Sequence, residues 1–279
     1  MPTLKKLTII WVLAALGLSF ASQVSYDSWR RYSPGKIGVD YNVYIEPQPP
    51  SPAIARGLSF GANEALADWY WLTLIQYYGG GTPNGKYRKL AEMFDLVTEL
   101  APKFASVYET GLVILPGEGF ADEAIALGAK GERNLPNSWQ PPYYTGLVHH
   151  IYKKDYLAAA QAFDRAARSP DAPANAKYFA GIYYAEANSR QTAYLIFKNI
   201  SESSDSEFVR ERATKYLGQL ELMFFLEEVI DRFQARYNRL PTDLSELVRV
   251  DLLKSIPTNP LGRQLEINPQ SGEVQEQKK

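Results

Sequence analysis

One five-residue pattern occurs three times at a constant spacing: Tyr108-Glu109-Thr110-Gly111-Leu112, Tyr143-Tyr144-Thr145-Gly146-Leu147 and Tyr178-Phe179-Ala180-Gly181-Ile182. Successive tyrosines, like successive glycines, are 35 residues apart. An alanine follows the three glycines by 13, 13 and 12 residues, and prolines recur every 34 residues, at Pro102, Pro136 and Pro170. A period of this length, filled by two helices, predicts a stack of helix pairs.

The residue types in the repeat fit close packing between helices. Gly111, Gly146 and Gly181 would let neighbouring helices approach, at a cost in helix propensity of about 1 kcal/mol each. The small residues Ala124 and Ala159 serve the same purpose in the second helix of a pair, and Phe163 fills the gap between layers. Proline stops the second helix of each pair. We therefore expect helical repeats over residues 58–204.

The 34- to 35-residue period, with glycine in the first helix and alanine in the second, resembles the tetratricopeptide repeat. Residues 57–274 also resemble a family of bacterial exported tetratricopeptide proteins of poorly defined function. That resemblance depends on an aromatic helix before the repeats, Ala67-Asp68-Trp69-Tyr70-Trp71 followed by Gln76-Tyr77-Tyr78-Gly79. It implies a helical architecture and export, and it supplies no catalytic residues.

The N-terminus has the pattern of an export signal. Lys5 and Lys6 precede the apolar run Leu7–Ala21, which is short for a full membrane span of roughly 20 residues. The positive-inside rule places the dilysine in the cytoplasm and the rest of the chain outside it. We expect residues 1–32 to form a single-pass anchor in the bacterial inner membrane, with the bulk of the chain in the periplasm. A cleaved signal peptide, giving a periplasmic or secreted protein, is the alternative.

Residues 33–57 are rich in proline and are expected to form an extended linker without helix, because proline fixes φ and lacks an amide hydrogen. Such a stiff segment would separate the folded part from the bilayer.

The C-terminal residues 205–279 change character. Glu207–Tyr237 is expected to be one long helix or a bent pair, followed by a short leucine-rich helix and two short strands around a turn. This order is similar to the C-terminal half of major pseudopilins, in which a carboxylate-rich loop binds calcium. Only Asp243 and Asn259 are available here, so we expect a module that caps the last repeat rather than a calcium site. The predicted fold is all-α: a tetratricopeptide-like solenoid with an N-terminal membrane segment and a small helix-plus-hairpin cap.

Several kinds of site are not expected. A net charge of −1 argues against nucleic-acid binding, and the lack of cysteine excludes disulfides and thiolate chemistry. The segment from Gly80 to Lys86 has the glycine and lysine spacing of a phosphate-binding loop, but Tyr87 stands where serine or threonine should follow. His149 and His150 point about 100° apart on a helix and cannot share a metal. We predict no enzyme activity, no cofactor and no metal site.

The tyrosine column is the candidate binding feature. In tetratricopeptide repeats this position of the first helix tends to face the concave groove, where stiff amphipathic rings suit a peptide. The proposed groove residues are Tyr108, Tyr143, Tyr144, Tyr178, Gln140 and Asn175. The alternative is that the tyrosines pack between helices.

The expected function is a non-catalytic scaffold or adaptor that binds a peptide or helix of a protein partner, in assembly of a pilus, secretion or surface-export complex. Two alternatives remain. The protein could be a permanent structural subunit of a larger membrane complex, or an enzyme accessory that uses the repeat face as a substrate platform.

Overall fold

The computed structural model describes residues 19, 22, 46–80 and 85–277. The chain divides into two compact units, residues 1–45 and 46–279, and nearly all described residues belong to the second. The described part of this second unit is mostly helical, which confirms the predicted all-α class, and it contains one two-stranded sheet. The predicted membrane segment, apart from two serines, lies outside the described residues. Among the residues that are described, no helix combines the length and the apolar character needed to cross a bilayer.

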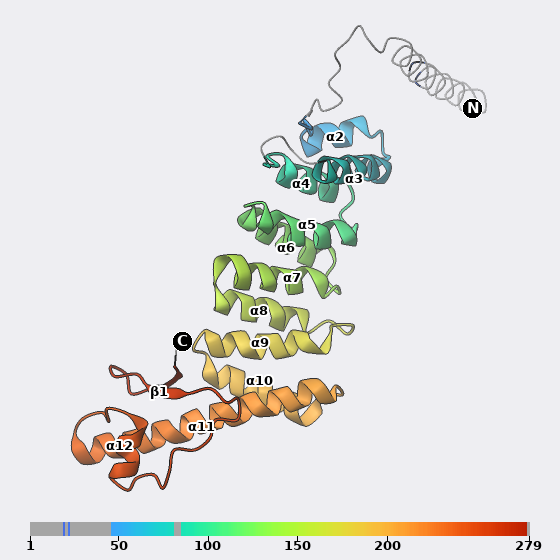
Figure 1. Ribbon diagram of the computed structural model, residues 1–279. Coiled ribbons are helices and arrows are strands. Elements are labelled where there is room, and N and C mark those ends of the chain that lie inside the picture. Colours follow the sequence, from blue (N-terminus) through green and yellow to red (C-terminus); the bar gives the residue numbers. More distant parts are fainter. Residues whose placement is uncertain (1–18, 20–21, 23–45, 81–84, 278–279) are drawn as a thin grey trace. The chain divides into compact units, whose positions relative to one another are not determined.

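The helices pack against their sequence neighbours in chain order, as Figure 1 shows. A short and a long helix begin the unit, and further helices pack in pairs, each pair on the next. The bounds are α2 (Pro52–Leu58), α3 (Asn63–Gly79), α4 (Leu90–Leu100), α5 (Ala105–Gly117), α6 (Ala121–Asn134), α7 (Gln140–Val148), α8 (Tyr156–Ala166), α9 (Ala174–Glu186) and α10 (Arg190–Ser203).

The repeated glycines lie where helices approach most closely. A Cβ added to Gly146 would stand 2.9 Å from two ring carbons of Phe163, and one added to Gly181 would stand 2.9 Å from Phe197. At Gly111 an added Cβ would be 2.9 Å from Phe94 and would also run into Leu127. Such distances are too short for carbon atoms in contact, so any side chain at these places would push two helices apart.

The second helices bury their small residues and end before the prolines. Ala124, Ala159 and Ala193 are fully buried. α4, α6 and α8 end at Leu100, Asn134 and Ala166, two to four residues before the repeated prolines. These endings have the cause expected from the sequence, since proline cannot continue the hydrogen-bond ladder.

The linker prediction needs one correction, because residues 52–58 form α2. Pro52 occupies the first helical turn, where the missing amide hydrogen would have had no partner in any case. The Ser51 side chain caps the helix by accepting a hydrogen bond from the Ile54 amide at 3.5 Å. Proline at this position therefore starts a helix instead of preventing one.

α7 does not end in an ordinary turn. It continues as a π-helix, η1 (His149–Lys153), which contains both histidines. Lys154 then takes the left-handed conformation with φ of 55°, and Asp155 caps α8 by accepting from the Ala158 amide at 2.9 Å. This wider turn sets the side chains of the two histidines at the junction of α7 and α8.

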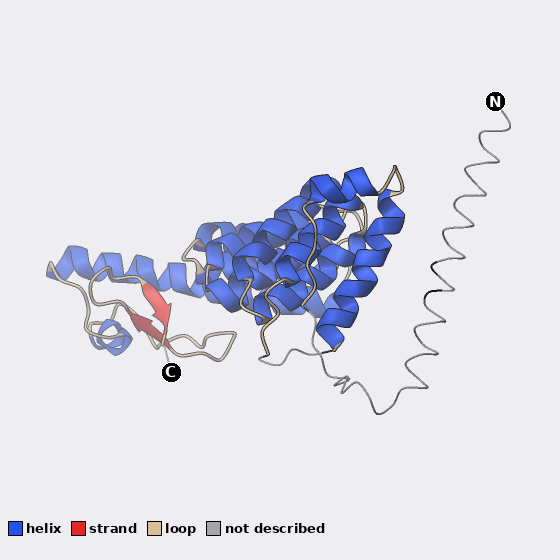
Figure 2. Cartoon of the chain, turned by 90° about the horizontal axis from the view of Figure 1, so that it is seen from above, coloured by secondary structure: helices blue, strands red, loops and turns tan. Residues whose placement is uncertain are grey.

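The C-terminal module is built on one unbroken helix, α11 (Glu207–Tyr237), which packs on α10 and extends beyond it (Figure 1). α12 (Leu244–Arg249) and the antiparallel strands β1 (Leu265–Ile267) and β2 (Val274–Glu276) lie along its far half (Figure 2). The strands pair Leu265 with Glu276 and Ile267 with Val274. One apolar cluster runs from α10 through α11 to the strands, so the module buries the end of the repeat array.

Candidate functional site

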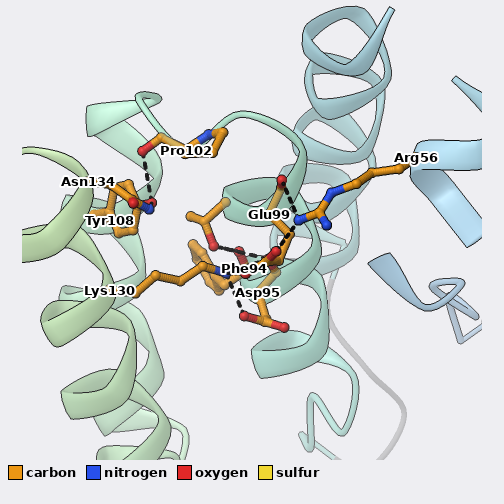
Figure 3. A network of polar contacts seen from close by, with 9 residues as sticks. Arg56, Phe94, Asp95, Glu99, Pro102, Tyr108, Lys130 and Asn134 are labelled. Carbon is orange, nitrogen blue, oxygen red and sulfur yellow. Dashed lines mark hydrogen bonds and ion pairs between the residues drawn. The ribbon is translucent and has the colours of Figure 1, made fainter. Parts of the chain in front are cut away.

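Tyr108 is buried completely. Its hydroxyl donates to the carbonyl oxygen of Pro102 at 2.9 Å and accepts from Nδ2 of Asn134 at 2.8 Å (Figure 3). Burial raises the pKa of the Tyr108 hydroxyl above its ordinary value of 10.0. A side chain with no exposed surface and with its hydroxyl already bonded on both sides cannot contact a partner.

Tyr143 and Tyr178 make equivalent contacts further along the chain. Tyr178 is 5% exposed, and its hydroxyl accepts from Nε of Arg212 at 3.2 Å. The Tyr143 hydroxyl accepts from Nδ2 of Asn175 at 3.4 Å. In all three cases the donor comes from a later helix, 26 to 34 residues on. The groove role predicted for Tyr108 and Tyr178 is therefore corrected: both rings pack between helices, and only Tyr143 keeps partial exposure.

The other three predicted groove residues are all half-buried. Gln140 is the first residue of α7, and its Oε1 accepts from the Ser138 hydroxyl at 2.6 Å. Asn175 carries a buried Oδ1 that has no hydrogen-bond partner in the described part of the chain. The Tyr144 ring meets that of Tyr143 edge to face, with 5.7 Å between centroids. Of the six residues, Tyr143, Tyr144, Gln140 and Asn175 can still contribute to a surface.

A cluster of half-buried rings extends from Tyr143 across α7, η1, α8 and α9. The Phe179 ring lies 6.4 Å from that of Tyr143 and 6.4 Å from that of Tyr183, and the His150 ring lies 4.5 Å from that of Tyr183, tilted by 36°. The buried ring of Phe163 touches Tyr143, Phe179 and Tyr183 from beneath. We call the partly exposed rings the aromatic face: Tyr143, Tyr144, His150, Tyr156, Phe179 and Tyr183.

Sequence reasoning missed Tyr156, Phe179 and Tyr183. The signal for Phe179 was present, because each of the last two repeats carries an aromatic pair, Tyr143-Tyr144 and Tyr178-Phe179, and the second member of each pair is partly exposed. Tyr183 lies four residues after Phe179 on the same side of α9, which a helical projection would also reveal.

Burial favours the neutral forms of Tyr183 and His150 in the aromatic face. Burial and the carboxylate of Glu186 raise the pKa of Tyr183 to about 12. Burial lowers the pKa of His149 and of His150 below 6.5, and the Nδ1 atoms of both are buried without a hydrogen-bond partner among the described residues. Rings of this kind offer flat apolar area with few polar atoms, which suits aromatic and aliphatic side chains of a partner.

A separate ionic network fixes the first helices. Lys130 of α6 contacts Asp95 at 2.7 Å and Glu99 at 2.8 Å, and Glu99 also pairs with Arg56 of α2 (Figure 3). The hydrogen bond from Lys130 is the main cause that lowers the pKa of Glu99. The network links α2, α4 and α6 and has the form of a structural brace, since every charge in it has an internal partner.

Within the part of the chain that is described, no three His, Asp or Glu side chains gather in a way that could hold a metal ion. No protein-family model matches the chain, and no curated protein has a significantly similar sequence.

Proposed function

We propose that this protein is a non-catalytic tetratricopeptide-type scaffold that binds a protein partner on the extracytoplasmic side of a bacterial membrane. The aromatic face is the observation that carries the proposal. It presents six partly exposed rings across α7, η1, α8 and α9, supported by the fully buried Phe163. Rings held by packing lose little freedom on binding, which favours recognition of a peptide or helix.

The membrane location is supported by the sequence alone. The basic and apolar N-terminal pattern favours a single-pass anchor, with a cleaved signal as the alternative. The likeness of residues 205–279 to the pseudopilin C-terminal region favours a role in assembly of a pilus, secretion or surface-export complex. A reporter enzyme that is active only outside the cytoplasm, fused after residue 279, should be active in cells.

A permanent subunit of a larger membrane complex is the second candidate. It is favoured by six apolar side chains that are exposed on α2, α3 and the turn between them, including Phe60 at 93% and Trp69 at 67%. The set is Ile54, Leu58, Phe60, Trp69, Leu72 and Ile75. Exposed apolar residues in this density often mark a surface that a partner covers.

The decisive experiment is co-purification from detergent-solubilised membranes. The double variant Tyr144→Ala/Phe179→Ala removes two half-buried rings of the aromatic face and should lose a stoichiometric partner that the native chain retains. Leu195→Ala is the matched control, because Leu195 is an apolar residue of α10 that is 59% exposed and lies outside the aromatic face. Equal partner recovery with the double variant and the native chain would refute a binding role for the face. Loss of the partner with Leu195→Ala as well would mean that the partner is held elsewhere.

A further inference from the structure

One end of the helical stack presents apolar side chains to solvent. The C-terminal end is covered by α11, α12 and the hairpin, whereas α2 and α3 form the other end (Figure 1). The terminal helices of a repeat array need a polar outer surface to stay soluble. Here they carry six exposed apolar residues, which we call the apolar set: Ile54, Leu58, Phe60, Trp69, Leu72 and Ile75.

α3 is apolar on two opposite faces. Ala67 and Leu74 are fully buried on the side that packs on α4. Trp69, Leu72 and Ile75 fall within about 120° of one another on the opposite side, where all three are exposed. A helix that is apolar all round is usually buried all round, in a protein core or in a bilayer. The outer face of α3 therefore indicates a covering layer that the described residues do not supply.

Phe60 lies in the turn between α2 and α3 with 93% of its surface exposed. Its φ of 49° is in the left-handed region, which is unfavourable for a bulky residue, and Gly61 continues the turn with φ of 90°. Asparagine or glycine would suit the backbone at this position better than phenylalanine. A solvated ring on such a turn neither fills the core nor eases the backbone, so its contact lies outside the described residues.

The charges around the apolar set restrict the kind of surface that it fits. α3 contains no lysine or arginine, and the one basic residue of α2, Arg56, is already paired with Glu99. Glu64 and Asp68 of α3 are exposed. Carboxylates repel anionic headgroups and attract the ammonium groups of zwitterionic lipids. The set therefore fits a zwitterionic bilayer surface that its apolar residues enter, rather than an acidic surface held by basic residues.

The position of the apolar set in the chain favours a bilayer over a second subunit. α2 and α3 are the first helices of the second unit, and the apolar run Leu7–Ala21, which precedes this unit, is expected to be the membrane anchor. Residues 22–45 separate that run from Glu46, and a segment of that length cannot reach beyond about 80 Å. A tether of this kind keeps the helices near the lipid surface, so contacts too weak to act in free solution become effective.

We propose that the apolar set docks on the periplasmic leaflet of the membrane as an interfacial contact with zwitterionic lipid. Phe60 and Trp69 enter the boundary between headgroups and acyl chains, where aromatic rings are favoured, and Glu64 and Asp68 stay at the headgroup level. The inference rests on the membrane location proposed above, because the anchor brings the set to the lipid. It assigns lipid, instead of a second subunit, as the cover of these side chains.

The chain contains no cysteine, so cysteines introduced one at a time can each carry a spin label. The full chain is reconstituted in nanodiscs of phosphatidylethanolamine and phosphatidylcholine. Labels at Ile54→Cys and Leu72→Cys are compared with a label at Leu195→Cys of α10, since the three side chains are exposed to nearly the same extent. Electron paramagnetic resonance measures their collisions with oxygen, which dissolves in lipid, and with a nickel chelate, which stays in water. The first two labels should have a ratio of oxygen to nickel collisions several-fold higher than the third.

A matched pair of variants separates docking from folding. Phe60→Asn should leave the fold intact, because asparagine suits the left-handed backbone and the ring buries almost no surface within the folded unit. Loss of the ring should lower the ratio of docked to free chain, read from the label at Leu72→Cys, by at least about tenfold. Leu195→Asn should leave this ratio unchanged. A higher salt concentration should leave it unchanged as well, because the contact is apolar.

Nickel collisions at Ile54→Cys and Leu72→Cys equal to those at Leu195→Cys would overturn the proposal. Spin–spin coupling between labels on two copies in one disc would also overturn it and would assign the apolar set to a second chain. Docking that requires anionic lipid would do the same, because basic residues elsewhere would then hold the surface. A chain that does not insert into the discs would refute the anchor and the docking together, whereas an inserted chain whose labels face water would refute the docking alone.

Discussion

Replacing Gly146 with alanine should destabilise the protein, although alanine is the better helix former. In the interior of α7 the change would gain about 1 kcal/mol of helix propensity. The added Cβ, however, would stand 2.9 Å from Cδ2 and Cε2 of Phe163, whose ring is fully buried. That ring cannot turn aside freely, because Tyr143 and Phe179 lie 5.1 and 5.4 Å from its centroid. Overpacking of this kind costs about 1–3 kcal/mol, so a net loss of up to about 2 kcal/mol is expected.

Two comparisons isolate the close approach as the cause. Gly117→Ala, at the end of α5, should be neutral or slightly stabilising, because an added Cβ there meets nothing nearer than the Tyr152 hydroxyl at 3.8 Å. In a Phe163→Leu background the ring is gone, and Gly146→Ala should then lose its unfavourable effect. The difference between the two backgrounds is the coupling energy of the pair, expected at about 1–3 kcal/mol.

Urea unfolding of the full chain, followed by circular dichroism, measures these effects as shifts of the midpoint at constant slope. The close-packing explanation would be refuted if Gly146→Ala raised the midpoint as Gly117→Ala does. It would also fail if Gly146→Ala had the same effect with and without the Phe163 ring.

Burial lowers the pKa of His149 and His150 below 6.5, so the unfolded chain binds more protons than the folded one just below that pH. The free energy of unfolding should therefore reach its highest value above about pH 6.5 and decrease as the pH falls below it. Urea titrations at several pH values should show a weaker pH dependence for His149→Gln/His150→Gln. An unchanged pH dependence in this variant would contradict the prediction. Lys130→Met removes the cation shared by Asp95 and Glu99 and should lower the free energy of unfolding by about 1 kcal/mol. Lys89→Met breaks a single local pair with Glu92 and should lower it by less. Equal losses in the two variants would argue against a bracing role for the Lys130 network. Hydrogen bonds from Arg239 and Thr242 lower the pKa of Glu246 to about 2, so its stabilising effect is present above 4.5 and is lost only as the pH falls through about 2. Arg239→Gln should move this pKa toward 4.5 in an NMR titration of the carboxyl carbon, and no movement would assign the shift to Thr242 alone.

The helices were predictable where one residue type has one physical use. Glycine at a 35-residue interval indicated close approach, and proline after the second helix indicated its end, so the ends of α4, α6 and α8 follow from the sequence. Pro52 was misread because the same residue that breaks a helix in its interior is accepted in its first turn, and only the Ser51 cap distinguishes the two cases. The choice between packing and binding for Tyr108 also lay beyond the sequence, since a repeated tyrosine satisfies either pattern until its burial is known.

The aromatic face and the environment of Gln219 were less predictable than the fold because both depend on contacts between elements distant in the chain. Phe179 and His150 lie on the same surface because α7 ends in a π-helical turn, and no spacing in the sequence predicts that turn. Gln219 reads as an ordinary polar residue of an amphipathic helix. It becomes distinctive only in the fold, where its amide nitrogen donates a hydrogen bond to Glu276, 57 residues later, and its buried amide oxygen accepts none from any described residue.

The repeat continues into α11 although its sequence signature ends at Gly181. α11 packs on α10 as α9 packs on α8, and Arg212, 34 residues after Tyr178, donates to the Tyr178 hydroxyl as Asn175 does to Tyr143. The position 35 residues after Gly181 is Tyr216, whose ring stacks on Phe197 with 5.0 Å between centroids. The Tyr216 ring also meets that of Tyr178 of α9 edge to face, with 5.9 Å between centroids, so this residue packs on the preceding helix pair. After α11 the chain continues with α12 and a hairpin instead of a further helix pair, and because both pack on α11, they cover the surface that another pair would have used.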